Sequence, residues 1–203
     1  GFDCMVKISE ESDFMILEGD EYLSSPEDRK PKFLHYHPNI ALISGIAWDH
    51  INVFKTFEDY TEQFKKFAES ITSGGVLVYN EEDENVIKIV ENSENYFKKI
   101  PYKTPKYEIR EGRVFLKTDL GEVPLSVFGK HNLLNMEGAK LICQQLGIME
   151  EEFYEAMMSF KGASKRLEKV EREDSGILYK DFAHAPSKVN ATTMAFRELF
   201  KKE

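Results

Sequence analysis

The stretch ALISGIAWDHINVF, residues 41–54, begins as a nearly continuous apolar run and ends in Asp49 and His50. Two further apolar runs stand on either side of it along the chain, DFMILE at 13–18 and GVLVYN at 75–80. Short apolar runs of this kind are typical of strands in a parallel sheet that is buried on both faces. The three runs therefore predict three strands of a parallel α/β fold.

A helix is predicted between the second and third of these strands. Residues 56–71 carry apolar side chains at helical spacing, and Thr56 stands where an N-cap is needed. A strand, a helix and a strand joined by short loops form a βαβ unit.

The second half of the chain has a different pattern. YEIR, RVFLKT and VPLSVF alternate apolar and polar residues and are separated by turn residues, which predicts a small antiparallel patch. Two helical segments follow at 132–147 and 149–160. A last strand at 177–183 then leads into a helix that has Pro186 in its first turn.

The composition excludes several classes of protein. The chain has 203 residues, 41% of them hydrophobic and 31% charged, and a formal net charge of −9. These values are typical of a globular protein and argue against a general nucleic-acid binder. No apolar run approaches the roughly 18–20 residues of a membrane span. We therefore expect a cytoplasmic protein that binds neither nucleic acid nor membrane.

Acidic residues and a histidine follow two of the predicted strands. Glu18 ends the first apolar run, and Asp49 and His50 end the second. Ligands of open α/β sheets bind at the carboxyl ends of the strands, where a carboxylate and an imidazole could hold Mg²⁺ or Mn²⁺. The alternative is that the acids form a solvated loop and that His50 caps the next segment.

Polar residues at three later positions also have both a functional and an ordinary interpretation. Asn132 and Asn135 share one helix face beside His131, and their amides could bind the edge of an adenine, although Asn132 could equally be an N-cap. Arg166 suits a phosphate but could be a surface cation. Asp181 and His184 follow the last strand and could be ordinary loop residues.

The order of these motifs is more specific than any one of them. EGDEY, the DH pair, GKHNLLN, FKGASKR and KDFAHAP occur in the order in which they occur in the Mur ligase family, which the chain resembles over nearly its whole length. Within the family, the segment around KFLHYHP is most similar to the branch that attaches a murein tripeptide, and the branch that adds L-alanine is its near neighbour.

The resemblance implies an ATP- and Mg²⁺-dependent amide ligase that joins UDP-N-acetylmuramate to L-alanine or to a peptide through an acyl phosphate. Glu18 and His50 match the family's metal ligands. His131, Asn132 and Asn135 match its adenine-binding segment, and Arg166 matches an arginine that reaches the nucleotide phosphates.

Two more positions match polar residues on the nucleotide and amine side of the family's C-terminal domain. These are Asp181 and His184, either of which could assist deprotonation of the amine. Lys65 falls in the helix that carries a carbamylated lysine in some relatives, but the two nearest branches do not obviously use one. We therefore leave Lys65 out of the site.

The resemblance also implies a division of the chain into two parts. Residues 1–162 match the later part of a parallel-sheet central ATPase domain with a small antiparallel patch. Residues 163–203 match the start of a Rossmann-like C-terminal domain. A phosphate loop of the form G-x-x-x-x-G-K followed by Ser or Thr does not occur in the sequence.

We therefore expect an internal fragment of a longer ligase that is inactive by itself and that could self-associate through unpaired strands. A catalytically inactive α/β module and a small metal-dependent hydrolase using Glu18, Asp49 and His50 are the alternatives.

Overall fold

A three-stranded parallel sheet forms one half of the protein. The computed structural model describes residues 8–48, 51–172 and 176–201. The sheet contains β1 (Ile40–Ile43), β2 (Val76–Asn80) and β3 (Lys98–Tyr102), in that spatial order. Leu42 pairs with Val78, and Val78 pairs with Ile100. The predicted parallel sheet is confirmed for the second and third apolar runs.

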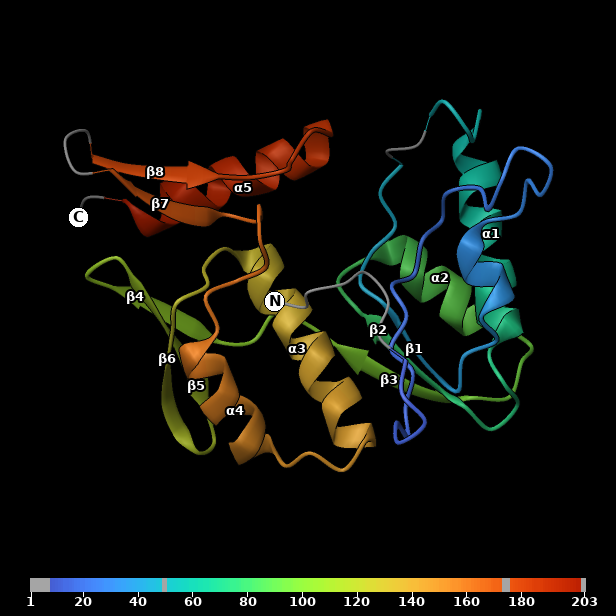
Figure 1. Cartoon of the computed structure of the whole chain (residues 1–203), viewed down its shortest axis with the longest axis horizontal. Coiled ribbons are helices and arrows are strands. Elements are labelled where there is room, and N and C mark those ends of the chain that lie inside the picture. The colour runs from blue at the N-terminus through green and yellow to red at the C-terminus, as the bar shows by residue number, and fades with distance from the viewer. Residues whose placement is uncertain (1–7, 49–50, 173–175, 202–203) are drawn as a thin grey trace.

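Two helices cover one face of this sheet (Figure 1). The predicted helix is α1 (Phe57–Ser70), and the Thr56 hydroxyl caps it by accepting a hydrogen bond from the Asp59 amide at 3.0 Å. A second helix, α2 (Glu84–Asn92), connects β2 to β3. Buried side chains of both helices, such as Phe64 and Val90, share one apolar core with β1 and β2.

The sequence pattern did not predict α2 or β3. The β3 segment KKIPY is short and contains Pro101, which has no amide hydrogen for a sheet. Proline is tolerated on edge strands, and among the described strands β3 pairs with β2 alone. The parallel pairing to β2 forms this strand where its own residue pattern does not indicate one.

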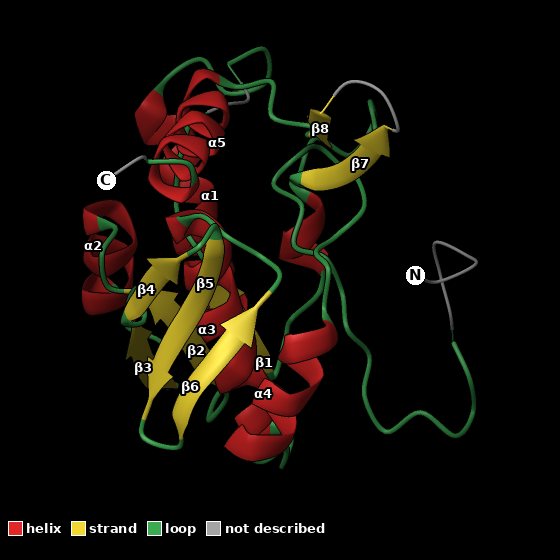
Figure 2. Cartoon of the chain, turned by 90° about the vertical axis from the view of Figure 1, so that its left-hand side faces the viewer, coloured by secondary structure: helices red, strands yellow, loops and turns green. Residues whose placement is uncertain are grey.

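The second half contains the predicted antiparallel patch (Figure 2). It is a meander of β4 (Tyr107–Arg110), β5 (Arg113–Thr118) and β6 (Gly121–Leu125). The two predicted helices are α3 (Lys130–Gln145) and α4 (Glu150–Ser159). Their buried residues form a second core with those of β5 and β6.

Helix α3 lies between the two cores. Leu133 and Met136 belong to the core of the meander. On the side toward the parallel sheet, a Cβ atom added to Gly138 would lie 3.0 Å from both the Leu42 Cδ1 and the Tyr102 hydroxyl oxygen. The absence of a side chain at position 138 therefore lets α3 approach the sheet closely.

The last part of the chain is a hairpin followed by a helix. The hairpin consists of β7 (Glu168–Arg172) and β8 (Gly176–Lys180), and α5 (Pro186–Leu199) follows with Pro186 in its first turn. The predicted last strand and last helix are thus confirmed, whereas β7 was not predicted. Phe196 on α5 lies 5.5 Å from Phe128, measured between ring centroids, and this contact joins α5 to the core of the meander.

The prediction of a strand at 13–18 is wrong. Residues 14–21 have no regular structure, and Phe14 and Ile16 are 62% and 87% exposed. A strand requires a hydrogen-bonded neighbour, and within the described residues none pairs with this segment.

A short 3₁₀ helix, Lys32–His35, lies between this segment and β1. No helix within residues 8–48, 51–172 and 176–201 combines the length and the apolarity that crossing a bilayer requires.

Candidate functional site

An open cleft of about 730 Å³ lies where the end of β2 and the start of α2 meet the start of α3 and the later turns of α5. Its volume is in the range of small-molecule sites, roughly 300–1,000 Å³. The β2–α2 side is polar and consists of Asn80, Glu82, Asp83, Glu84 and Asn85. The α3 side contributes Lys130, His131 and Leu134, and the α5 side contributes Ala191, Met194, Ala195 and Glu198.

The cleft depends on a close approach between α3 and α5. Gly129, the N-cap of α3, has φ of 88°, and a Cβ atom there would lie 2.6 Å from the Cβ of Ala195. A larger residue at 129 would therefore be strained in its backbone and would push α5 away. In the next turn the Asn132 side chain donates a hydrogen bond to the Phe128 carbonyl at 2.8 Å. Asn132 lies inside α3 and donates rather than accepts, so the alternative that Asn132 is the N-cap is wrong, and Gly129 holds that position.

The residues that follow β2 hold three segments together. The Asn80 amide donates to the Ser44 carbonyl at 3.0 Å, and an Asp83 carboxylate oxygen accepts from the Ile46 amide at 2.8 Å. The other Asp83 oxygen accepts from the Asn85 and Val86 amides and so caps α2. These bonds anchor the loop that leaves β1.

The same segment is tied to α3 by an ion pair. Glu82 lies 2.9 Å from the Lys130 ammonium and accepts a hydrogen bond from the Thr104 hydroxyl at 2.8 Å. Burial raises the pKa of Glu82, but the contacts with Lys130 and Thr104 outweigh this effect and lower it. Glu82 is therefore a carboxylate at neutral pH, and it holds the start of α3 beside the end of β2.

His131 is the predicted site residue that lines the cleft. Its ring is half-buried, and burial is the main cause of its lowered pKa. The negative charge of Asp181 opposes this shift and the positive charge of Arg166 adds to it. Asp181 and Arg166, two predicted residues from other segments, therefore both lie within electrostatic reach of His131.

Both carboxylate oxygens of Asp181 are engaged. One accepts from the Leu167 amide at 3.2 Å, and the other accepts from the Thr192 hydroxyl at 2.6 Å. Burial raises the pKa of Asp181, but the Thr192 hydroxyl and backbone amides outweigh burial and lower it. Asp181 thus ties the start of β7 to α5 and is a weak proton acceptor at neutral pH.

Arg166 and His184 both lie close to the aromatic ring of Phe182. The Arg166 guanidinium carbon is 5.7 Å from the ring centroid of Phe182, and the His184 ring centroid is 5.1 Å from it. Arg166 itself is exposed, and its two neighbours Lys165 and Leu167 have positive φ of 58° and 51°. Backbone strain of this kind is often found at functional sites. The exposed guanidinium is available to bind an anion.

Other predicted residues do not join this group. Asn135 is exposed on α3 and does not line the cleft. Glu18 is exposed in the irregular segment before the 3₁₀ helix Lys32–His35, and His50 lies outside the described residues. Within the described ranges, no three His, Cys, Asp or Glu side chains are grouped so that they could hold a metal ion. The predicted metal site of Glu18 and His50 stays a prediction, because His50 lies outside the described residues.

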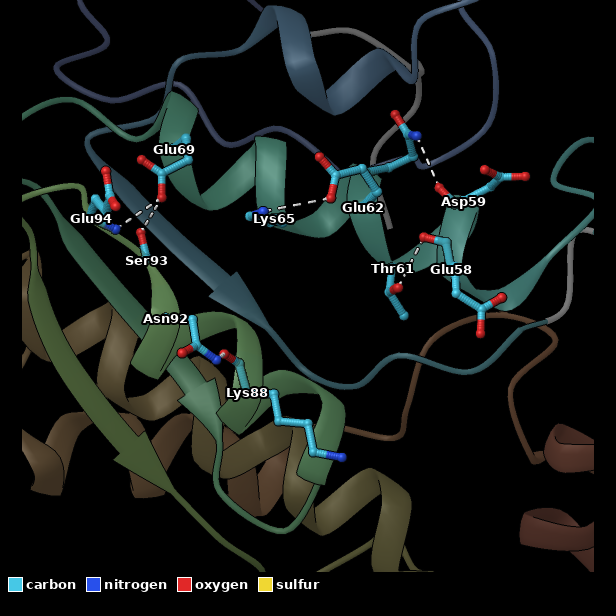
Figure 3. A network of polar contacts seen from close by, with 11 residues as sticks. Glu58, Asp59, Thr61, Glu62, Lys65, Glu69, Lys88, Asn92, Ser93 and Glu94 are labelled. Carbon is cyan, nitrogen blue, oxygen red and sulfur yellow. Dashed lines mark hydrogen bonds and ion pairs between the residues drawn. The ribbon is translucent and has the colours of Figure 1, made fainter.

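Lys65 is on the solvent side of α1, as Figure 3 shows. Its ammonium lies 3.8 Å from the Glu62 carboxylate, and both side chains are largely exposed. This arrangement is an ordinary ion pair of a helix surface.

Sequence reasoning missed the residues of the β2–α2 side of the cleft. The segment NEEDEN directly follows the apolar run of β2. The rule that ligands bind at the carboxyl ends of strands would have drawn attention to Asn80 and Asn85. The α5 side gave no such signal, because Ala191 and Met194 are common residues of a helix.

Comparison with known proteins matches residues 3–143 to the Mur ligase middle domain. A UDP-N-acetylmuramate–L-alanine ligase of Caldicellulosiruptor saccharolyticus is 31% identical over 208 residues, which cover 95% of this chain and 43% of that protein. A second relative is the UDP-N-acetylmuramate–L-alanyl-γ-D-glutamyl-meso-2,6-diaminoheptandioate ligase of Escherichia coli. It is 28% identical over 200 residues, which cover 92% of this chain and 43% of that protein.

The fold is shared with solved structures of the same group. MurF from Acinetobacter baumannii superimposes with a TM-score of 0.70 at 18% identity, over 82% of this chain and 39% of that one. UDP-N-acetylmuramate-alanine ligase MurC from Thermotoga maritima gives a TM-score of 0.62 at 20% identity, over 87% and 44%. The chain spans less than half the length of the curated relatives that it matches. The match to the middle domain extends over more than half of the chain and shows that the chain belongs to the Mur ligase family.

Proposed function

We propose that this chain provides the nucleotide-binding part of an ATP-dependent ligase that joins UDP-N-acetylmuramate to L-alanine or to a murein tripeptide. Family membership and the names of the relatives support this function. The observation that carries it is His131, which lines the cleft and lies within electrostatic reach of Asp181 and Arg166, while Asp181 is hydrogen-bonded to Thr192 of α5. Convergence of predicted residues from separate segments is expected of a shared binding site.

The residues present fit a nucleotide. The cleft offers an apolar side and a polar side for a base, and Arg166 offers an exposed guanidinium for phosphate. Bound ATP supplies the phosphoryl group that activates the muramyl carboxylate as an acyl phosphate, which the amine then attacks. The chain's own contribution is to orient the nucleotide between α3 and the loop of Arg166.

His184 is better suited than Asp181 to accept a proton from the attacking amine. The His184 Nδ1 lies 2.9 Å from the Phe182 carbonyl oxygen. A carbonyl oxygen only accepts, so Nδ1 carries the hydrogen and Nε2 is left with a lone pair. His184 is exposed, whereas both oxygens of Asp181 are engaged. We therefore assign proton transfer to His184 and a positioning role to Asp181.

We also propose that the whole protein uses Mg²⁺, with Glu18 and His50 as its predicted ligands. Asn132 and Asn135 stay predictions as adenine ligands.

Four further expectations accompany the proposed function. Residues 1–162 are assigned to the central domain and residues 163–203 to the C-terminal domain. The 203 residues contain no G-x-x-x-x-G-K segment followed by Ser or Thr, so we expect no amide formation by this chain alone. Self-association and a cytoplasmic location also stay predictions.

The test is an assay of the protein encoded by the complete reading frame. It is supplied with UDP-N-acetylmuramate, ATP and either L-alanine or tripeptide, and ADP release and product mass are measured. Arg166→Ala should raise the KM for ATP and lower kcat, whereas Arg113→Ala, on the exposed side of β5, should change neither. His184→Gln should lower kcat and leave the KM for ATP unchanged. Absence of product with both amines would refute the proposed ligase.

A further inference from the structure

The backbone on both sides of Arg166 is strained. Lys165 and Leu167 have positive φ of 58° and 51°, although neither residue is a glycine. Such conformations persist only where the surrounding contacts hold them. The Lys165 amide donates to the Glu168 carboxylate at 2.8 Å, inside the same turn. The Leu167 amide donates to the Asp181 carboxylate at 3.2 Å, so the direction of Arg166 depends on how Asp181 is held.

The Asp181 carboxylate also acts on the segment that leads to His184. The backbone amides of Phe182 and Ala183 contribute to the lowered pKa of Asp181. The next residue is His184, and its Nδ1 lies 2.9 Å from the Phe182 carbonyl oxygen. One carboxylate therefore influences both the loop of Arg166 and the loop of His184, and a rotation of that carboxylate would disturb both.

Thr192 fixes the orientation of this carboxylate. Its hydroxyl donates to the second Asp181 oxygen at 2.6 Å, a distance typical of a hydroxyl bonded to a charged carboxylate. Thr192 is half-buried in α5 and does not line the cleft, although its helix neighbours Ala191 and Met194 do. With one oxygen held by α5, the other oxygen stays directed at the Leu167 amide.

We propose that Thr192 is a positioning residue of the ligase reaction, whose hydroxyl acts through Asp181 to align Arg166 for the phosphates and His184 for the amine. This inference rests on the proposed function, since it assumes that Arg166 and His184 serve one reaction. In this role Thr192 contacts neither substrate. A valine at position 192 has the same branched shape but no donor, so it would leave the Asp181 carboxylate able to rotate.

The test measures the steady-state kinetics of Thr192→Val in the protein encoded by the complete reading frame. A small misplacement of reacting groups can lower the rate by about 100-fold. We therefore expect kcat/KM for ATP to fall by about 10- to 100-fold, with a higher KM for ATP and a lower kcat. Thr192→Ser should stay within about three-fold of the unmodified protein, because serine supplies the same hydroxyl donor.

Thr193→Val is the matched control. Thr193 is the next residue of α5, and its exposed side chain donates to the Val189 carbonyl of the same helix at 2.8 Å. Its replacement should leave both kinetic constants unchanged. Valine and threonine have similar helix propensities, so both valine variants should retain α5, which circular dichroism checks. Thr192→Ala also lacks the donor and gives the same comparison if the valine at 192 impairs folding.

Double variants separate positioning from a general loss of stability. If Thr192 acts through Arg166, Thr192→Val should raise the KM for ATP much less in the Arg166→Ala background, because the guanidinium is already absent. In the His184→Gln background, Thr192→Val should likewise have a smaller effect on kcat. A residue that contributes only to stability would change the kinetics by the same factor in every background.

The outcomes separate the inference from the proposed function. Full activity of Thr192→Val, or equal losses in Thr192→Val and Thr193→Val, would refute the role of Thr192 while the proposed ligase stands. The same holds if Thr192→Ser is as impaired as Thr192→Val, or if the effects of Thr192→Val and Arg166→Ala simply multiply. If the unmodified protein forms no product with either amine, the proposed function fails, and the inference fails with it.

Discussion

Replacing Lys140 by methionine should destabilise the protein far more than the same change at an exposed lysine. The Lys140 ammonium joins α3 to α4, 2.8 Å from Glu137, 3.0 Å from Glu150 and 3.1 Å from the Tyr154 hydroxyl. Its side chain is only 11% exposed. Burial lowers the pKa of Lys140, but the hydrogen bonds with these three partners outweigh burial and raise it.

The chain offers a matched control for this change. Lys65 is also three residues after a glutamate on a helix, but its ammonium is 3.8 Å from Glu62 and its side chain is 56% exposed (Figure 3). Lys140→Met leaves two partly buried carboxylates without a counter-charge, so it should lower the free energy of unfolding by about 3 kcal/mol. Lys65→Met should change it by less than about 0.5 kcal/mol.

Urea unfolding followed by circular dichroism measures both changes. For a protein of this size, about 3 kcal/mol corresponds to a fall in Tm of roughly 6–12 °C. Glu137→Gln in the Lys140→Met background should recover part of the loss, because it removes one unpaired charge. A difference between the two methionine variants of less than about 1 kcal/mol would refute the reasoning, since it would mean that the buried ammonium is no more important than an exposed one.

The difference in stability between the unmodified protein and Lys140→Met should depend on pH. The hydrogen bond from Lys140 is the main cause of the lowered pKa of Glu150. A carboxyl group whose pKa is lowered by folding stabilises the folded state above its ordinary pKa of 4.5, and this contribution is lost as the pH falls through the folded value. The stability gap between the unmodified protein and Lys140→Met should therefore narrow as the pH falls below about 4.5.

Three further changes test other parts of the structure. Tyr102→Phe removes a buried hydroxyl that has no partner among the described residues, so the free energy of unfolding in urea should stay the same or rise by about 1 kcal/mol; a clear loss would show that the hydroxyl has a partner. Gly129→Ala adds a Cβ atom to a residue with positive φ, and this atom would lie 2.6 Å from the Cβ of Ala195. It should lower stability by about 2 kcal/mol and speed amide hydrogen exchange in α5, and unchanged exchange would contradict the close packing of α5 on α3. His131 has a pKa lowered mainly by burial, so the unfolded chain takes up the proton first, and stability should fall as the pH drops below about 6.5. His131→Gln should reduce that slope, and an equal slope in the variant would contradict the burial of the ring.

The helices show how far the sequence could predict the fold. α1 has apolar residues at helical spacing and a capping hydroxyl at Thr56, and α5 has Pro186 at its start. Both signals act within one or two turns, so the sequence carries them directly. The segment 13–18 shows the opposite case, because an apolar run becomes a strand only when another strand pairs with it. The apolarity of Phe14 and Ile16 was visible, but the absence of pairing within the described residues was not.

The candidate site divides in the same way. The order of the motifs indicated the Mur ligase family and drew attention to His131, Arg166 and Asp181, because residue types and their order are properties of the sequence. Only the tertiary structure decided which of these residues meet. In the folded chain Asp181 accepts a hydrogen bond from Thr192, and Asn85 lines the cleft across from α5. The cleft exists because sheet pairing and the contact of α5 with α3 join segments that are distant along the chain, and such contacts leave no local periodicity in the sequence.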